Sequence, residues 1–222
     1  MCLFESHTTL VMAGDSVTDV GRTRPIAENR KEDLGRGYPA VVDALLTACR
    51  PDLQMRIINT GISGNTSRDL LERWDEDVLS HHPDYVSCMI GVNDIWRQFD
   101  NPHIPHRHVS FDSFMKNYEQ MISRTMPQVK GMLVISCCYM EPNHEEPFRA
   151  MVDKYNAGAK ELCDKYGAIY VDAMAEFDKG MKYNHPCFYT WDHVHPQLGG
   201  HMVIAKAFMK AAGISMDDQG PI

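Results

Sequence analysis

The sequence contains no long hydrophobic run and no cluster of basic residues, and each absence argues against a class of protein. No apolar stretch approaches the ~20 residues that a membrane-spanning helix needs, so we expect no membrane partner. Lys and Arg number 22 against 30 Asp and Glu, which gives a formal net charge of −8. Because nucleic-acid binding requires a positively charged face, we expect no nucleic-acid partner either.

A secretory signal is also missing. The first residues, MCLFESHTTLVMAGDS, have no basic start and no long apolar stretch that leads to a small-residue cleavage site. The seven cysteines lack the paired spacing of metal ligands, and we expect free, mostly buried thiols. Because free thiols are typical of reducing compartments, these two features together predict a cytoplasmic protein.

The composition is that of an ordinary globular protein. Hydrophobic residues make up 44% of the 222 residues and charged residues 23%, close to the averages for globular domains. The sequence has no internal repeat, low-complexity tract or Gly/Ser-rich linker, so we expect one domain that spans residues 1–222. The 15 methionines and several apolar residues at expected surface positions favour a homo-oligomer.

Short apolar runs alternate with longer segments of helical periodicity. The runs that predict strands are residues 8–13, 55–59, 84–90, 131–136 and 168–172. The segments that predict helices are residues 38–48, 66–79, 111–126, 147–166 and 197–212. Such alternation is typical of a parallel sheet covered on both faces. We therefore predict a three-layer α/β/α sandwich with a central five-stranded parallel sheet in a flavodoxin-like order.

Residues 98–110, QFDNPHIPHRHVS, form the least regular stretch. Their prolines and polar residues predict a surface loop. His103, His106 and His108 are potential metal ligands, but they lack carboxylate or cysteine neighbours at a recognised ligand spacing. We therefore expect a solvated loop rather than a metal site.

Polar residues and glycines stand out in four segments. GDS follows the first predicted strand, NTGISGN the second and GVND the third, while WDHVHP precedes the last helix. The carboxyl ends of parallel strands share one edge of the sheet, where open α/β folds bind ligands. We therefore expect the four segments to meet at this edge.

Three side chains in these segments have the chemistry of a catalytic triad. A serine hydroxyl is a weak nucleophile at neutral pH unless a base takes its proton, so Ser16 requires a histidine within hydrogen-bond reach. His195 is the candidate base. Asp192, three positions earlier, is the carboxylate that would keep the second ring nitrogen protonated. We predict that these three residues are catalytic.

Attack on a carbonyl also requires hydrogen-bond donors for the negative oxygen of the tetrahedral intermediate. Gly64 has no side chain and presents its N–H at close approach. Asn93 offers a side-chain amide, and the N–H of Ser16 lies at an expected helix start. We predict that these three residues form an oxyanion hole.

Each segment taken alone has a simpler explanation. Gly-Asp-Ser after a strand is common in turns and helix caps, and loops rich in Asn and Asp are common without any function. Asp192, His193, His195 and His201 also suggest a metal cluster, which would make the chain a metal hydrolase. The joint occurrence of all four segments, in this order and at strand ends, favours the triad.

The four segments resemble, block by block, the sequence motifs of the SGNH hydrolases. GDSVTD is similar to the block of the nucleophile, NTGISGNTS to that of the oxyanion glycine, GVND to that of the asparagine and DHVH to that of the aspartate and histidine. The resemblance implies the SGNH hydrolase fold. It gives Ser16, Gly64, Asn93, Asp192 and His195 the roles stated above.

Longer strings resemble those of GDSL-type acetylesterases that act on xylan or xylo-oligosaccharides. They are GDSVTDVGRTRP, LGRGYPA, NTGISGNTSRDLLERWDEDV, MIGVNDIWRQFD and WDHVHPQLGGHM, which extend over residues 14–202. The resemblance implies a serine esterase without metal or other cofactor that removes O-acetyl groups from xylo-oligosaccharides or other acetylated sugars. General esterases, lipases and acyl-CoA thioesterases share the triad and remain alternatives, as does a non-catalytic carbohydrate-binding protein.

Three residues near the predicted triad are candidates for substrate contact. The indole of Trp191 or Trp96 can stack on a sugar ring, although large aromatic residues beside turns more often pack against protein. Arg97 either orients a substrate hydroxyl or pairs with Asp100. Of the two indoles, Trp191 is the better candidate.

Overall fold

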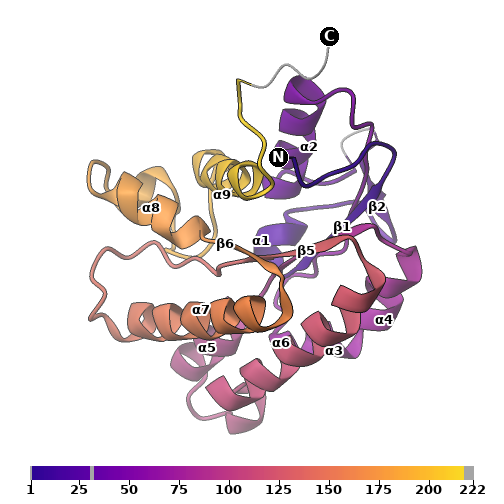
Figure 1. The fold of residues 1–222 in the computed structure, drawn as a ribbon. Helices are drawn as coiled ribbons and strands as arrows, with labels where there is room; N and C mark the ends of the chain where they lie inside the picture. Colours follow the sequence, from indigo (N-terminus) through magenta and orange to yellow (C-terminus); the bar gives the residue numbers. More distant parts are fainter. Residues whose placement is uncertain (1, 31–32, 218–222) are drawn as a thin grey trace.

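Six strands form one sheet in the middle of the fold, which the computed structural model describes for residues 2–30 and 33–217 (Figure 1). The strands are β1 (Thr9–Gly14), β2 (Ala27–Glu28), β3 (Arg56–Asn59), β4 (Tyr85–Met89), β5 (Gly131–Ile135) and β6 (Ile169–Val171). Their order across the sheet is β2-β3-β1-β4-β5-β6. Neighbouring strands run parallel apart from β2 and β3. The predicted three-layer α/β fold is confirmed.

The sheet has one strand more than the sequence predicted. β2 contributes two residues, which pair antiparallel with Ile58 and Asn59 of β3 at the edge of the sheet. Two residues are too few to show an alternating pattern, so the sequence carried no signal for this strand. The other five strands have the flavodoxin-like order that was predicted. In this order the connections diverge between β1 and β4, where folds of this class bind ligands.

The helices include two that the sequence did not predict, namely α5 and α8, while α1 begins at Ser16, where a helix start was expected. Within the described residues the α-helices are α1 (Ser16–Asp19), α2 (Tyr38–Cys49), α3 (Ser67–Glu72), α4 (Trp74–Asp77), α5 (Val92–Asp100), α6 (Phe111–Thr125), α7 (Pro147–Tyr166), α8 (Ala173–Met181) and α9 (Leu198–Ala211). The predicted helix 66–79 is divided into α3 and α4 at Arg73.

The predicted loop 98–110 was wrong for its first three residues, which belong to α5. The helix continues because Ile95 is buried and the amide of Gln98 donates to the carbonyl oxygen of Asp94 at 2.9 Å. Further along, Pro105–Arg107 form a short 3-10 helix. The predicted domain, residues 1–222, stays a prediction; residues 1, 31–32 and 218–222 lie outside the described part of the chain.

Alternate residues of the strands point into two different layers of helices. In β1, Leu10 and Met12 pack with α2, α8 and α9, whereas Val11 and Ala13 pack with the layer of α3 to α7. Figure 1 shows these two groups of helices on opposite sides of the sheet. Full burial of one of the larger side chains stabilises the fold by roughly 1.5–3 kcal/mol. Contacts on both faces explain why the strands are continuous apolar runs in the sequence.

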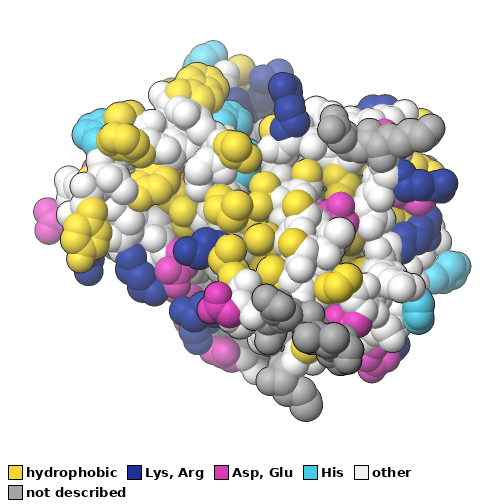
Figure 2. Space-filling view, turned by 90° about the horizontal axis from the view of Figure 1, so that it is seen from above, with side chains coloured by type: hydrophobic (Ala, Val, Ile, Leu, Met, Phe, Trp, Pro, Cys, Tyr) yellow, Lys and Arg dark blue, Asp and Glu magenta, His cyan; other side chains and the backbone are white. Residues whose placement is uncertain are grey.

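The outer surface over α2, α8 and α9 carries apolar side chains interspersed with charged ones (Figure 2). No helix in the described ranges combines the length and the apolar character that crossing a bilayer requires. All seven cysteines are free, and five of them are buried. The prediction of free, mostly buried thiols is therefore confirmed.

Candidate active site

Ser16 is the first residue of α1 and lies directly beyond the end of β1. The buried carboxylate of Asp15 caps the helix, because it accepts a hydrogen bond from the N–H of Val17 at 3.0 Å. The corner is tight: a Cβ atom at Gly14 would lie 2.5 Å from the carbonyl oxygen of Met89 in β4. Glycine at this position therefore lets β1 end against β4 and turn at once into the helix that carries the Ser16 hydroxyl.

The structure brings the three predicted triad residues together. The Oγ atom of Ser16 lies 2.9 Å from Nε2 of His195, and Nδ1 of His195 lies 2.6 Å from Oδ2 of Asp192. Ser16 and His195 are 179 positions apart in the chain, so their contact depends on the arrangement of the sheet. A continuous hydrogen-bonded chain thus runs from the hydroxyl through the imidazole to the carboxylate.

The Asp192 carboxylate also shapes the turn that carries His195. Its Oδ1 atom accepts the backbone N–H groups of Val194 at 3.0 Å and His195 at 2.7 Å. Burial acts to raise the pKa of Asp192, but the hydrogen bonds from the His195 ring and from the two backbone N–H groups outweigh it and lower the pKa. Asp192 is therefore ionised at neutral pH.

His193 anchors this turn to the segment that follows β5. Its backbone is in the left-handed region, with φ of 66°. Its Nδ1 atom lies 2.7 Å from the carbonyl oxygen of Met140, and its own carbonyl oxygen accepts the N–H of Met140 at 2.7 Å. These two contacts bind the turn to the segment after β5, whereas the bonds to Asp192 are within the turn itself.

Gly64 and Ser16 each present a backbone N–H without a hydrogen-bond partner among the described residues. Gly64 has φ of +84°, a conformation that favours glycine. Among the described residues, no hydrogen bond engages the N–H of Gly64 or that of Ser16. Both groups are therefore available to an atom of a ligand.

The amide of Asn93, buried in the first turn of α5, has a fixed orientation. Its Nδ2 atom donates to the carbonyl oxygen of Asn65 at 3.0 Å, and its Oδ1 atom accepts from Arg97 at 3.3 Å. A carbonyl oxygen only accepts hydrogen bonds and a guanidinium only donates them, so the two contacts distinguish the oxygen of the Asn93 amide from its nitrogen. Within residues 2–30 and 33–217, no acceptor engages the second Nδ2 hydrogen, which is therefore available.

An arginine that the sequence did not single out connects the segments of the site. Arg73 donates to the carbonyl oxygens of Gly14 at 3.1 Å and Thr60 at 2.8 Å, and to Oδ1 of Asn65 at 2.7 Å. It also pairs with Asp77 at 2.7 Å. One side chain therefore fixes the ends of β1 and β3 and the loop after β3. The i, i+4 spacing of Arg73 and Asp77 indicates only an ordinary helix-surface pair, so sequence gave no sign of this role.

Asp19 provides a second connection between α1 and the loop after β3. Its buried Oδ2 atom accepts from the N–H of Ser63 at 3.0 Å and from its hydroxyl at 2.9 Å, and it pairs with Arg24 at 2.7 Å. Burial acts to raise the pKa of Asp19, but hydrogen bonds from Arg24 and Ser63 outweigh it and lower the pKa. The loop that carries Gly64 is thus held against the helix that carries Ser16.

Asp94 joins α5 to α3 in the interior. Its fully buried carboxylate accepts the N–H of Ser67 at 2.8 Å and also the Ser67 hydroxyl. Burial raises the pKa of Asp94 to about 7 and that of Asp15 to about 6. These two carboxyl groups therefore titrate much closer to neutral pH than Asp192.

Two indole rings lie against the His195 imidazole. The ring of Trp191 is stacked on it, with centroids 5.8 Å apart and planes inclined by 11°, and Trp96 is tilted by 49° at 5.7 Å. Trp191 is 75% exposed. Arg97 lies over the ring of Trp96 at 5.4 Å and also pairs with Asp100. The three predicted substrate-contact residues are thus all near the triad.

Two of the other histidines that were considered as metal ligands, His201 and His108, make contacts of their own. Nδ1 of the buried His201 accepts the N–H of Tyr38 at 3.1 Å, and burial, followed by the nearby His195, lowers the pKa of His201 to about 4. Nε2 of His108 lies 2.9 Å from the carbonyl oxygen of Asn101. The described part of the chain contains no group of three or more His, Cys, Asp or Glu side chains placed to hold a metal.

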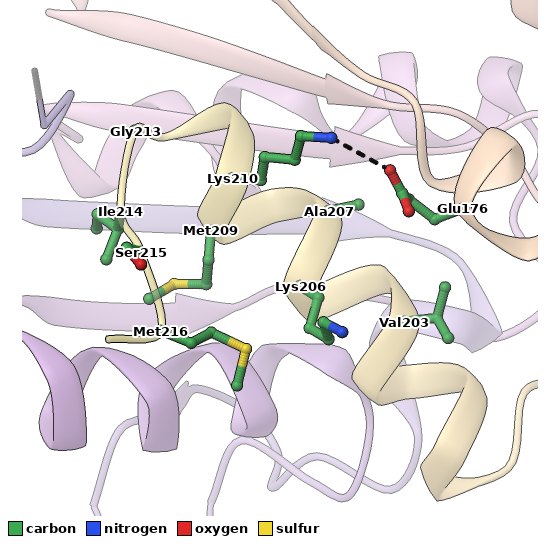
Figure 3. A pocket seen from close by; sticks show the side chains of 10 residues that line it. All are labelled: Glu176, Val203, Lys206, Ala207, Met209, Lys210, Gly213, Ile214, Ser215 and Met216. Atoms are coloured by element: carbon green, nitrogen blue, oxygen red, sulfur yellow. Dashed lines mark hydrogen bonds and ion pairs between the residues drawn. The ribbon is translucent and has the colours of Figure 1, made fainter. Parts of the chain in front are cut away.

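A separate hollow of about 530 Å³ lies between α8, α9 and the chain that follows α9 (Figure 3). Glu176 and Lys210 pair across part of it at 3.4 Å, and Met209 and Met216 supply apolar walls. No triad residue lines this hollow. It is therefore distinct from the hydrogen-bonded chain of Ser16, His195 and Asp192.

Two solved structures are similar over nearly the whole fold. Axe2, an acetylxylan esterase from Geobacillus stearothermophilus, has a TM-score of 0.94 and 41% identity, over 96% of this chain and 97% of its own. An α/β hydrolase from the metagenome of Lake Arreo, Spain, has the same TM-score and 41% identity, over 96% of this chain and 98% of its own. Catalytic mutants of Axe2 replace a serine, an aspartate or a histidine by alanine, at the same separations along the chain as the predicted triad here.

The sequence comparisons agree with the structural ones. The chain is 42% identical over 208 residues to an acetylxylan esterase of Geobacillus stearothermophilus. The aligned region covers 94% of this chain and 95% of that protein. A model of the GDSL-like Lipase/Acylhydrolase family matches residues 12–203. The predicted resemblance is therefore confirmed: the chain belongs to the GDSL-like lipase/acylhydrolase family.

Proposed function

We propose that the chain is a serine esterase that removes O-acetyl groups from xylo-oligosaccharides or other acetylated sugars. The observation that carries the proposal is the hydrogen-bonded chain of Ser16, His195 and Asp192. Its geometry suits a nucleophile, a general base and a carboxylate that orients the base. The same spacing of serine, aspartate and histidine in the Axe2 catalytic mutants supports it.

In this proposal the Oγ atom of Ser16 attacks the acetyl carbonyl carbon while Nε2 of His195 takes the hydroxyl proton. The ionised Asp192 keeps the proton on Nδ1 of His195 and stabilises the imidazolium that forms. His195 then gives its proton to the departing sugar oxygen, which leaves an acetyl group on Ser16. Water, activated by the same histidine, releases acetate and restores the hydroxyl.

The negative oxygen of the tetrahedral intermediate requires donors that are in place beforehand. The unused N–H groups of Ser16 and Gly64 and the second Nδ2 hydrogen of Asn93 supply them. Arg97 contributes by fixing the amide of Asn93, because it binds the Oδ1 atom. We therefore assign Arg97 a positioning role.

The choice of an acetylated sugar rests on similarity and on the aromatic surroundings of the histidine. The chain is 42% identical to an acetylxylan esterase over nearly its full length. Trp191, stacked on His195 and 75% exposed, offers an open indole surface beside the nucleophile for a sugar ring. Trp96, which contacts the same imidazole, supports the histidine and helps to exclude water from it.

Acetate release from acetylated xylo-oligosaccharides tests the proposal, with Ser16→Ala as the matched variant. We expect the variant to lose turnover to the background level while its thermal unfolding midpoint stays within a few degrees of the parent. Hydrolysis by a pure Ser16→Ala preparation would refute the assigned nucleophile. Nitrophenyl acetate, butyrate and octanoate distinguish an acetylesterase from a lipase, general esterase or thioesterase, since a preference for octanoate contradicts the acetyl assignment.

We also propose that the chain forms a homo-oligomer and acts in the cytoplasm. Phe188 and Leu198 are 65% and 70% exposed close in sequence to the exposed Trp191, and large exposed apolar side chains favour association. The free thiols support a reducing compartment. Light scattering of the purified chain and fractionation of the cells that produce it test the two statements.

A further inference from the structure

A second hollow, of about 430 Å³, adjoins the predicted oxyanion hole. It lies where α3, α5 and the short 3-10 helix Pro105–Arg107 meet. Its lining includes Gly64, Arg68, Asp69, Arg97, His106 and Arg107. Three arginines around one hollow are notable in a chain with a net charge of −8.

Two of these arginines keep their positive charge unpaired. Arg68 donates to the carbonyl oxygens of His106 at 3.1 Å and His108 at 2.8 Å, and neither acceptor carries a charge. Within the described residues, no ion pair engages Arg68 or Arg107. The exposed Arg107 therefore has its guanidinium free for an anion.

Two acidic residues bear on the charge of the hollow: Asp69, which lines it, and Asp100, which binds one of its arginines. Asp69 accepts the N–H and the hydroxyl of Thr66 in the capping box of α3. Asp100 pairs with Arg97. The bonds from Thr66 leave the negative charge of Asp69 in place, because their donors are neutral. Three arginines nevertheless face only the two carboxylates of Asp69 and Asp100, so one positive charge remains in excess and the hollow attracts negative charge.

The hollow communicates with the site of the proposed chemistry. Gly64 belongs to both, and Arg97 reaches from the hollow to Oδ1 of Asn93 at 3.3 Å. An acetyl group has a single methyl beyond its carbonyl, far too small to fill a space of about 430 Å³. A group that occupies the hollow during turnover therefore belongs to the sugar part of the substrate.

We propose that this hollow is a subsite for a carboxylate carried by the substrate, as in an acetylated oligosaccharide that bears a uronic acid. Arg107 and Arg68 bind the carboxylate, because a guanidinium matches the two oxygens of a carboxylate with parallel N–H groups. This inference rests on the proposed acetylesterase function. It adds that the enzyme selects acidic acetylated sugars over neutral ones.

The test compares kcat/KM for acetate release from two acetylated xylo-oligosaccharides of equal length, one with a uronic acid substituent and one without. We expect the parent enzyme to prefer the acidic substrate by about three- to tenfold at low salt, and less at high salt, as for attraction between partly exposed charges. Arg107→Gln should abolish the preference. Arg124→Gln, which removes the same charge from an exposed ion pair on α6, should retain it.

Other outcomes identify which statement fails. Equal kcat/KM for the two substrates in the parent enzyme overturns the subsite, whereas failure to hydrolyse either one overturns the acetylesterase function. Free acetate presents the same carboxylate chemistry. A third outcome is inhibition by acetate that Arg107→Gln relieves, together with equal kcat/KM for both substrates. It would show that the hollow binds the product and not the substrate, and it also overturns the proposal.

Discussion

The two halves of the site are held in place by different means. Ser16, Gly64 and Asn93 lie on three separate segments. Arg73 and Asp19 connect the first two, and the buried Asp94 connects the segment of Asn93 to α3. His195 instead lies on a single turn between Thr190 and Pro196, which is shaped mainly by the carboxylate of its own neighbour Asp192.

This difference follows from what each half of the site must position. Donors for an oxyanion must be fixed relative to one another across several strands, so long-range contacts are needed. A base and its carboxylate three positions apart can be oriented by one local turn. Damage to the first half should therefore spread through the fold, whereas damage to the second should remain local.

The largest effect is expected for Asp192→Asn. The amide oxygen of asparagine can still accept the N–H groups of Val194 and His195, so the turn should persist. Its NH₂ group would face Nδ1 of His195 and favour the ring tautomer that cannot take the proton of Ser16. We expect kcat to fall by about 10⁴-fold with an unchanged thermal unfolding midpoint.

Asp192→Ala is the control that separates the two roles of the carboxylate. It should lose a similar amount of kcat and, in addition, unfold at a lower temperature, because two backbone N–H groups lose their acceptor. Equal unfolding midpoints for the two variants would show that Asp192 does not hold the turn. A kcat for Asp192→Asn within tenfold of the parent would remove the carboxylate from the mechanism.

Arg73→Met should damage the other half in a different way. Methionine keeps much of the length of the side chain but donates no hydrogen bond, so the carbonyl oxygens of Gly14 and Thr60 lose a partner. We expect the free energy of unfolding to fall by about 2–3 kcal/mol. We also expect kcat to fall by about tenfold at a nearly unchanged KM, since fixed donors act on the transition state.

The matched control for this variant is Arg56→Met at the opposite end of β3. Arg56 pairs with Glu28 at the surface, and exposed pairs contribute about 0–1 kcal/mol. Denaturant unfolding and steady-state kinetics of both variants provide the measurement. If the two variants lose equal stability and keep the parent kcat, Arg73 does not connect the segments of the site in the way described.

Sequence was informative about the site where chemistry requires particular residue types at strand ends. Ser16, Asp192 and His195 could be selected because a nucleophile, a base and a carboxylate have few substitutes, and the structure places them in contact. The long apolar strands could be predicted for a related reason, since burial on both faces leaves a continuous pattern.

The residues that sequence missed act through geometry that no local pattern encodes. Arg73 appears in the sequence as an ordinary helical arginine, and its bonds to Gly14 and Thr60 exist only once β1 and β3 are neighbours. The same side chain stands where the predicted helix 66–79 is divided. The hollow beside Gly64 likewise depends on a loop that brings Arg107 next to α3, which charge patterning along the chain does not indicate.

The smallest expected effect on kcat concerns two carboxyl groups whose environments differ, Asp94 and Asp192. Burial raises the pKa of Asp94 to about 7, while hydrogen bonds lower that of Asp192. The folded state therefore holds a proton on Asp94 that the unfolded chain releases near pH 4. Because the folded state binds more protons, the stability associated with Asp94 is present below pH 4 and is lost as the pH rises to about 7.

Asp94→Asn removes this titration, and the amide retains an oxygen for the N–H of Ser67 and an NH₂ group for its hydroxyl. Relative to the parent, the variant should therefore gain stability steadily between pH 4 and pH 7 and show a constant difference above that range. Thermal unfolding of both proteins at unit intervals of pH measures it. If the unfolding midpoints of the two proteins instead run parallel from pH 4 to pH 8, Asp94 is ionised throughout this range. The fully buried carboxylate of Asp94 then carries its charge as readily as Asp192 does in the turn of His195.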